Sequence, residues 1–145
     1  METIYRRANR EDAYEMARLS TQLGYSVLPT ELKERVKAVQ AAPHHIIFVA
    51  EQHNRLVGWI HAHERLLIES APFVEIGGFI VDAACRGQGV GKKLVRLCEE
   101  WASGEGYAKI RVRTNTSRED AQAFYSRLGY QSVKAQQVYD KKLET

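Results

Sequence analysis

A glycine-rich segment near the middle of the chain carries the clearest chemical signal in the sequence. Gly87, Gly89 and Gly91 stand between a strand pattern that ends at Asp82 and a strong helical pattern that starts near Val90. Glycines let backbone N–H groups converge on a ligand, and the N-terminus of a helix adds partial positive charge. Without a ligand, each glycine would cost the helix start roughly 1 kcal/mol. The segment therefore predicts a phosphate or pyrophosphate site.

Two common phosphate-binding motifs do not fit these residues. A Walker loop needs glycine five residues before Gly91 and Ser or Thr after Lys92, but Arg86 and Lys93 stand there. A dinucleotide fingerprint that starts at Gly87 needs a glycine at position 92, which is a lysine. Both failures argue against an ATP-binding or NAD-binding protein.

The segment from Arg86 to Gly91 reads R-x-x-G-x-G, and here the chain resembles the GNAT superfamily of acyl-CoA-dependent N-acetyltransferases. A second match follows in the correct order. Asn115 precedes a helical segment, Asp120 to Tyr130, that contains Phe-Tyr and ends in Leu-Gly-Tyr. The resemblance covers about Phe73 to the C-terminus, whereas the first 45 residues match only in the order of one strand and two helices.

The resemblance implies acetyl-CoA as co-substrate and no metal cofactor. The backbone of Phe79, Ile80 and Val81 would pair with the pantetheine arm, in a strand that splays from its parallel neighbour. Asn115 would contact the cofactor or order its own loop, and a simple turn residue is the alternative. The pyrophosphate would lie in the loop formed by Arg86, Gly87, Gln88, Gly89, Val90, Gly91 and Lys92.

Acetylation of an amine requires a neutral nitrogen, yet an alkylammonium has a pKa of about 10.4. The resemblance implies a catalytic glutamate at a place like that of Glu75, which would be the general base. Its alternatives are a solvated strand residue or a ligand for a cationic acceptor. Tyr125 matches the family's general acid, which protonates the leaving thiolate. The alternative for Tyr125 is packing.

The function implied is transfer of an acetyl group to a primary amine by direct attack in a ternary complex. A CoA-binding sensor without turnover is the alternative. The acceptor, a small molecule or a peptide, is not identified by the sequence. His61 and His63 alternate on one strand, which suits a half-exposed face or an acceptor site, while no Cys or acid converges with them to bind a metal.

Composition limits the remaining classes. The chain has 145 residues, with 21 Lys and Arg against 18 Asp and Glu, and the charges are interleaved, so nucleic-acid binding is not expected. Only Cys85 and Cys98 are present, and no apolar stretch approaches the roughly 20 residues of a membrane span. We expect one cytoplasmic domain over residues 1–145, with a homodimer as an open option.

The pattern of elements predicts an α/β fold of mixed α+β type. A mostly antiparallel, splayed sheet of six to seven strands would carry about four helices. We expect Thr30 to cap the second helix, His53-Asn54 to form a hairpin turn, and Ser117 and Asp120 to form a capping box. The last two expected strands are Tyr130 to Val133 and Gln137 to Leu143.

Overall fold

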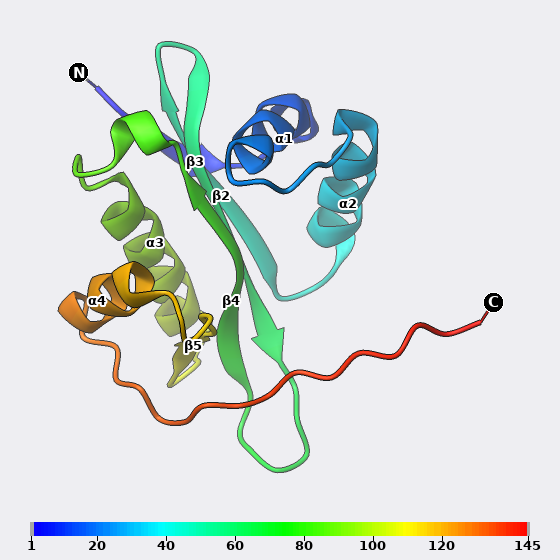
Figure 1. Ribbon diagram of the computed structural model, residues 1–145, viewed down its shortest axis with the longest axis vertical. Coiled ribbons are helices and arrows are strands. Elements are labelled where there is room, and N and C mark those ends of the chain that lie inside the picture. Colours follow the sequence, from blue (N-terminus) through cyan, green and yellow to red (C-terminus); the bar gives the residue numbers. More distant parts are fainter. Residues whose placement is uncertain (1, 145) are drawn as a thin grey trace. The chain divides into compact units, whose positions relative to one another are not determined.

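The structure is a computed structural model that describes residues 2–144, and the chain divides into two compact units, Met1–Val112 and Arg113–Thr145. The first unit contains a sheet with the strand order β1-β2-β3-β4-β5 (Figure 1). The first four strands are antiparallel to their neighbours, and β5 is parallel to β4. The strands are β1 (Ile4–Arg7), β2 (His45–Gln52), β3 (Arg55–Arg65), β4 (Phe73–Val81) and β5 (Ile110–Val112).

Helices cover both faces of this sheet (Figure 1). On one face, α1 (Ala13–Gln22) and α2 (Pro29–Ala41) bury a hydrophobic core cluster against β2, β3 and β4. On the other face, α3 (Val90–Gly104) packs so closely on Gly58 that an added Cβ would lie 3.0 Å from Leu94 Cδ1. The expected α/β class is thereby confirmed. The cluster on the first face comprises Met16, Leu19, Val36, Ile47, Val49, Leu56 and Ile80.

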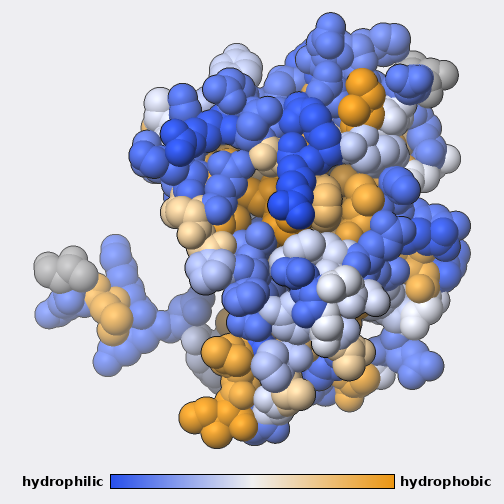
Figure 2. Space-filling model, turned by 180° about the vertical axis from the view of Figure 1, so that it is seen from behind, coloured by the Kyte–Doolittle hydropathy of each residue, from blue (hydrophilic) through white to orange (hydrophobic). Residues whose placement is uncertain are grey.

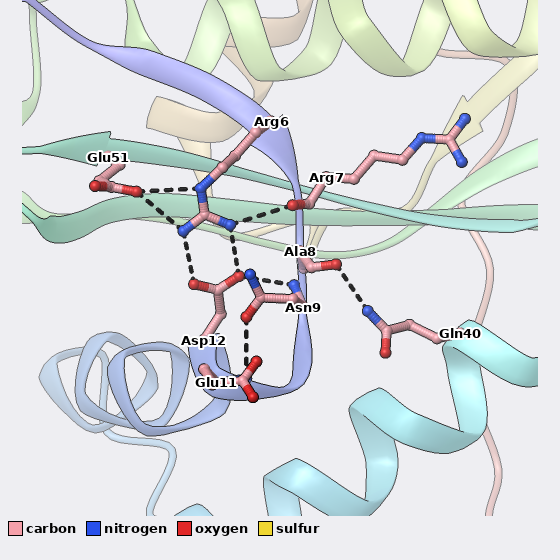
Figure 3. Close-up of polar contacts among 8 residues, drawn as sticks. All are labelled: Arg6, Arg7, Ala8, Asn9, Glu11, Asp12, Gln40 and Glu51. Atoms are coloured by element: carbon pink, nitrogen blue, oxygen red, sulfur yellow. Dashed lines mark hydrogen bonds and ion pairs between the residues drawn. The ribbon is translucent and has the colours of Figure 1, made fainter.

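An arginine joins the first strand to the first helix (Figure 3). Arg6 donates two hydrogen bonds of 2.8 Å to Asp12 and also contacts Glu51 on β2 at 3.0 Å. The bonds to Asp12 raise the pKa of this guanidinium further above its ordinary value. Asn9 caps the short 3-10 turn η1 (Arg10–Asp12) that leads into α1. The chain thus enters α1 through a capped turn.

Two expected helix caps are wrong. The second helix begins at Pro29, whose fixed φ suits the first turn, so Thr30 lies inside the helix. The last helix, α4 (Glu119–Arg127), has Arg118 at its N-cap with no side-chain cap. The backbone N–H and the hydroxyl of Ser117 both donate to Asn115 Oδ1, at 2.9 and 2.8 Å. Because Ser117 is engaged there, it does not form a capping box.

The turn between β2 and β3 is confirmed. His53 and Asn54 have φ of 51° and 62°, the left-handed pair that a two-residue hairpin of type I′ needs. Gly24 and Gly129, each just beyond a helix, also have positive φ, as helix ends commonly require. The local sequence signal at His53-Asn54 therefore predicted the boundary between β2 and β3 correctly.

The two C-terminal strands are absent from the described chain. Residues 130–144 form neither helix nor strand, and among residues 2–144 the sheet has five strands, fewer than the expected six to seven. A strand persists only where its backbone pairs and one face is buried. Here the large apolar side chains are exposed, as Figure 2 shows for the segment that leads to the C-terminus. They are Val133, Val138, Tyr139 and Leu143.

Candidate active site

The glycine-rich loop follows the end of β4. Asp82 Oδ1 accepts a 3.0 Å hydrogen bond from the Ala84 N–H and so caps the short turn η2 (Ala83–Cys85). Gly87 and Gly89 then adopt φ of 84° and 80°, which L-residues rarely adopt. An added Cβ at either glycine would meet no atom within 4 Å. Both glycines therefore allow the backbone conformation of the loop and leave open space beside it, and neither is required for packing within the protein.

Backbone N–H groups at the start of α3 point out of the helix end. The first helical hydrogen bond of α3 runs from the Lys93 N–H to the Gly89 carbonyl at 3.1 Å. The N–H groups of Val90, Gly91 and Lys92 precede it and have no partner within the helix. The exposed side chains of Arg86 and Lys92 add positive charge beside them. This arrangement is suited to bind an anion such as a pyrophosphate.

A buried amide supports the loop from behind. Gln52, at the end of β2, donates to Gln88 Oε1 at 3.2 Å and to Thr3 Oγ1 at 2.8 Å, and accepts from the Cys85 thiol at 3.7 Å. Burial raises the pKa of Cys85, which disfavours the reactive thiolate. Sequence analysis missed Gln52, because only its buried position distinguishes it from other glutamines.

The strand that leads to the loop contains an irregularity. His61 pairs with Gly78 and Ala62 with Ile76, so Gly77 is an extra residue in β4. Within the described chain, the register of β5 on β4 runs from Val74 to Ile76 and stops before Gly77. β4 is therefore bulged at Gly77, and its pairing with β5 is limited to the residues before that bulge. Of the residues expected to pair with the pantetheine arm, Ile80 is buried in the core, while Phe79 and Val81 are half-buried.

Glu75 lies on β4 just before the bulge and is 8% exposed. Its Oε2 accepts a 2.9 Å hydrogen bond from Arg65 Nη1 on β3. His63 is its cross-strand partner on β3, and Arg111 is its partner on β5. A buried carboxylate held by a guanidinium has a fixed position, which suits either a proton acceptor or an ion-binding group.

Three histidine rings stack beside Glu75. His45, His61 and His63 have ring centroids 5.1 to 5.3 Å apart, and His45 Nδ1 lies 3.0 Å from His61 Nε2. Burial, and then the other two histidines, lower the pKa of His61 to about 4. Stacked rings do not aim their nitrogens at a common point, and no metal-binding group is found among residues 2–144. Sequence analysis missed His45, because its place depends on the β2–β3 register.

Two of the expected site residues belong to the second unit. Tyr125 on α4 is buried, and its ring makes edge contacts with Phe124 and Tyr130 at centroid distances of 5.1 and 5.6 Å. Asn115 precedes α4 and accepts the two hydrogen bonds from Ser117. The Asn115 side chain therefore forms a local turn with Ser117.

β4 with its bulge and the glycine-rich loop before α3 both lie within residues 10–130. Residues 10–130 match the Acetyltransferase (GNAT) family. The chain belongs to this family, and it is an acyltransferase of the N-acetyltransferase class. The match spans residues of both units.

Two of the curated relatives are named for acetylation of small amines. The chain is 26% identical over 133 residues to aminoglycoside N(6')-acetyltransferase type 1 of Serratia marcescens, which covers 86% of this chain and 89% of that protein. It is 34% identical over 83 residues to the aminoalkylphosphonate N-acetyltransferase of Salmonella typhimurium, over 57% of this chain and 54% of that protein.

Solved structures share the fold at low identity. The aminoglycoside N-acetyltransferase AAC(6')-Iy in complex with CoA has a TM-score of 0.86 at 20% identity, over 98% of this chain and 96% of that one. A GNAT family acetyltransferase of Staphylococcus aureus has a TM-score of 0.76 at 22% identity, over 99% of this chain and all of that one. Among the residues described for this protein, no helix combines the length and apolarity that crossing a bilayer needs.

Proposed function

We propose that this protein transfers the acetyl group of acetyl-CoA to a primary amine of a small molecule by direct attack in a ternary complex. The observation that carries the proposal is the open loop at Gly87 and Gly89. Both glycines have positive φ and empty space beside them, and the N–H groups that follow at the start of α3 have no partner within the helix. This loop fits the CoA pyrophosphate.

The cofactor site would extend from the loop along β4. The residues Arg86, Gly87, Gln88, Gly89, Val90, Gly91 and Lys92 would surround the pyrophosphate, and the backbone of Phe79, Ile80 and Val81 would pair with the pantetheine arm. The register of β5 on β4 supports this path, because it covers Val74 to Ile76 and does not extend along the residues that follow. The thioester would then lie near the Gly77 bulge, with Asn115 ordering the loop before α4.

Two side chains would complete the proton transfers. Glu75 would take a proton from the acceptor ammonium, and the neutral nitrogen would attack the thioester carbon. The C–S bond would then break as the nitrogen loses its second proton, and Tyr125 would protonate the departing thiolate and regain a proton from solvent. A second role for Glu75, binding the acceptor's ammonium group, is favoured by its hydrogen bond to Arg65, which already occupies Oε2.

The relatives support a small-molecule acceptor over a peptide, since both are named for such compounds. The family match over residues 10–130 supports one functional domain that includes both units. The two buried free cysteines support a reducing, cytoplasmic location. A homodimer is supported by the exposed apolar side chains of residues 133–143, which a second copy could cover.

Release of CoA thiol from acetyl-CoA, measured over a panel of amines, tests the proposal. We expect release that depends on both acetyl-CoA and one class of amine. Binding of acetyl-CoA without release for any amine would instead identify a CoA-binding sensor. Binding of ATP or NAD in place of CoA would overturn the assignment of the loop.

A further inference from the structure

We propose that the acceptor amine carries an anionic oxyacid group, a carboxylate or a phosphonate, and that Arg65, Lys109 and Arg111 bind this group. The inference rests on the proposed function and names the substrate class of the same site. The three side chains lie at the end of β4 opposite the glycine-rich loop.

Strand register places these cations on one face of the sheet. Arg65 of β3 pairs with Phe73 of β4, and Glu75 of β4 pairs with Arg111 of β5. Residues directly opposite on neighbouring strands share a face, and residues two apart on one strand do so as well. Lys109 Nζ and Arg111 Cζ both lie over the Phe73 ring, 4.3 and 4.6 Å from its centroid. The cations therefore surround Phe73 and Glu75.

Among residues 2–112, the ion pairs leave positive charge in excess at this place. Glu75 is the one carboxylate among these residues, and Arg65 is bound to it. Glu64, the neighbouring acid on β3, points to the other face and accepts a 2.6 Å hydrogen bond from Tyr107. Among residues 2–144, neither Lys109 nor Arg111 forms an ion pair. Two cations thus remain without a carboxylate.

Phe73 holds these two cations without neutralising them. Its ring is 1% exposed and fixed in the sheet, and a cation over an aromatic face is attracted by the ring quadrupole. The attraction restrains the long side chains yet leaves their charge and N–H donors available for an anion. A ligand with a carboxylate or phosphonate would meet positioned donors, which reduces the entropy cost of binding.

The neighbouring residues add no negative charge. His45, His61 and His63 continue the same face towards the Gly77 bulge, and a histidine is neutral or positive. A polycationic acceptor would therefore meet repulsion from Lys109 and Arg111. An amino acid or aminoalkyl oxyacid would place its ammonium near Glu75 and its anionic group on the two cations. The amine and the anionic group of such an acceptor are therefore separated by only a short chain.

Matched pairs of amines test this inference. We would measure CoA thiol release for 2-aminoethylphosphonate and β-alanine against ethanolamine, which has a similar chain and no negative charge, and against a polyamine. We expect kcat/KM at least about 10-fold higher for an anionic acceptor than for ethanolamine. The preference should fall as salt is added. The two anionic compounds distinguish a phosphonate from a carboxylate acceptor.

The variant Lys109→Gln/Arg111→Gln identifies the site. It should raise KM for the anionic acceptor by about 10-fold or more and leave the affinity for acetyl-CoA unchanged, whereas kcat/KM for ethanolamine should change by less than about 3-fold. Lys33→Gln/Lys37→Gln removes two exposed cations on α2 of the same unit and is the matched control. Arg65 is left intact because it also holds Glu75.

Three results would overturn the inference: equal use of ethanolamine, preference for the polyamine, or equal effects of the two double variants. If the Lys109→Gln/Arg111→Gln protein does not fold, the inference is tested on the wild-type protein alone. The test is then its preference for anionic amines and the salt dependence of that preference. If no amine releases thiol, the proposed function fails. In that event, calorimetric titration of 2-aminoethylphosphonate still tests the cations, because binding requires no turnover.

Discussion

The two ends of β4 are built in different ways. After Val81 the chain offers backbone, with positive φ at Gly87 and Gly89, exposed N–H groups and no packing against the glycines. At the other end, Glu75 is buried, bound by Arg65 and flanked by histidines from β2 and β3. The first end suits a ligand whose shape does not vary, such as a cofactor. The second end suits a ligand whose identity depends on side chains.

The largest expected effect comes from a side chain placed in the loop. Gly89→Val should abolish measurable acetyl-CoA binding, a loss of at least about 100-fold in affinity, because the new side chain would occupy the anion's space and valine disfavours φ of 80°. Isothermal titration measures the loss. Gly104→Ala, at an open helical glycine with ordinary φ, is the control. Unchanged affinity in Gly89→Val would remove the loop from the cofactor site.

The second effect tests whether the ends of β4 act separately. Glu75→Gln should lower kcat by about 10²-fold with acetyl-CoA affinity unchanged, because it removes a proton acceptor and leaves the loop intact. The loss should shrink at high pH, where more acceptor amine is already neutral. Glu69→Gln, an exposed acid in the preceding loop, is the control. If only the acceptor KM rises, Glu75 is a ligand and not the base.

Tyr125→Phe should give a smaller loss. A thiol with a pKa near 8.5 is already a fair leaving group, so deletion of the phenol hydroxyl should lower kcat by about 10-fold to 10³-fold. The ring contacts with Phe124 and Tyr130 remain, which should preserve folding. Tyr139→Phe, at an exposed tyrosine, controls for a general effect of the change. A wild-type rate when chemistry is rate-limiting would show that another group protonates the sulfur.

The contrast between the ends of β4 also explains what the sequence could predict. Local patterns predicted three elements correctly. Glycine spacing predicted the loop, the apolar stripe after Val90 predicted α3, and His53-Asn54 predicted the hairpin turn. The position of Arg65 and His45 beside Glu75 depends on strand register, which no local pattern sets. The two C-terminal strands were wrongly predicted, because alternation there has no partner strand within the described chain.

The smallest effect is on stability and concerns the stacked histidines. Because the folded state lowers the pKa of His61 from 6.5 to about 4, the unfolded chain binds a proton more readily between those two pH values. Folding stability should therefore fall as pH falls from 6.5 towards 4. Glu15, whose pKa is lowered to about 2 chiefly by Arg18, loses its contribution only below its ordinary value of 4.5. Over most of this pH range, the change in folding stability therefore reports protonation of the histidines.

Thermal unfolding at pH 7 and pH 4.5 measures this dependence. His61→Phe keeps an aromatic ring against His45 and His63 but cannot bind a proton, so its Tm should fall by several degrees less than that of the wild-type protein between the two pH values. His53→Asn is the control, since His53 is an exposed turn residue and asparagine tolerates its positive φ. Equal slopes for wild type and His61→Phe would mean that the stack does not disfavour the charged imidazole. The histidines would then be an ordinary hydrated surface, and the contrast between a backbone-built and a side-chain-built end of β4 would rest on Glu75 and its cations alone.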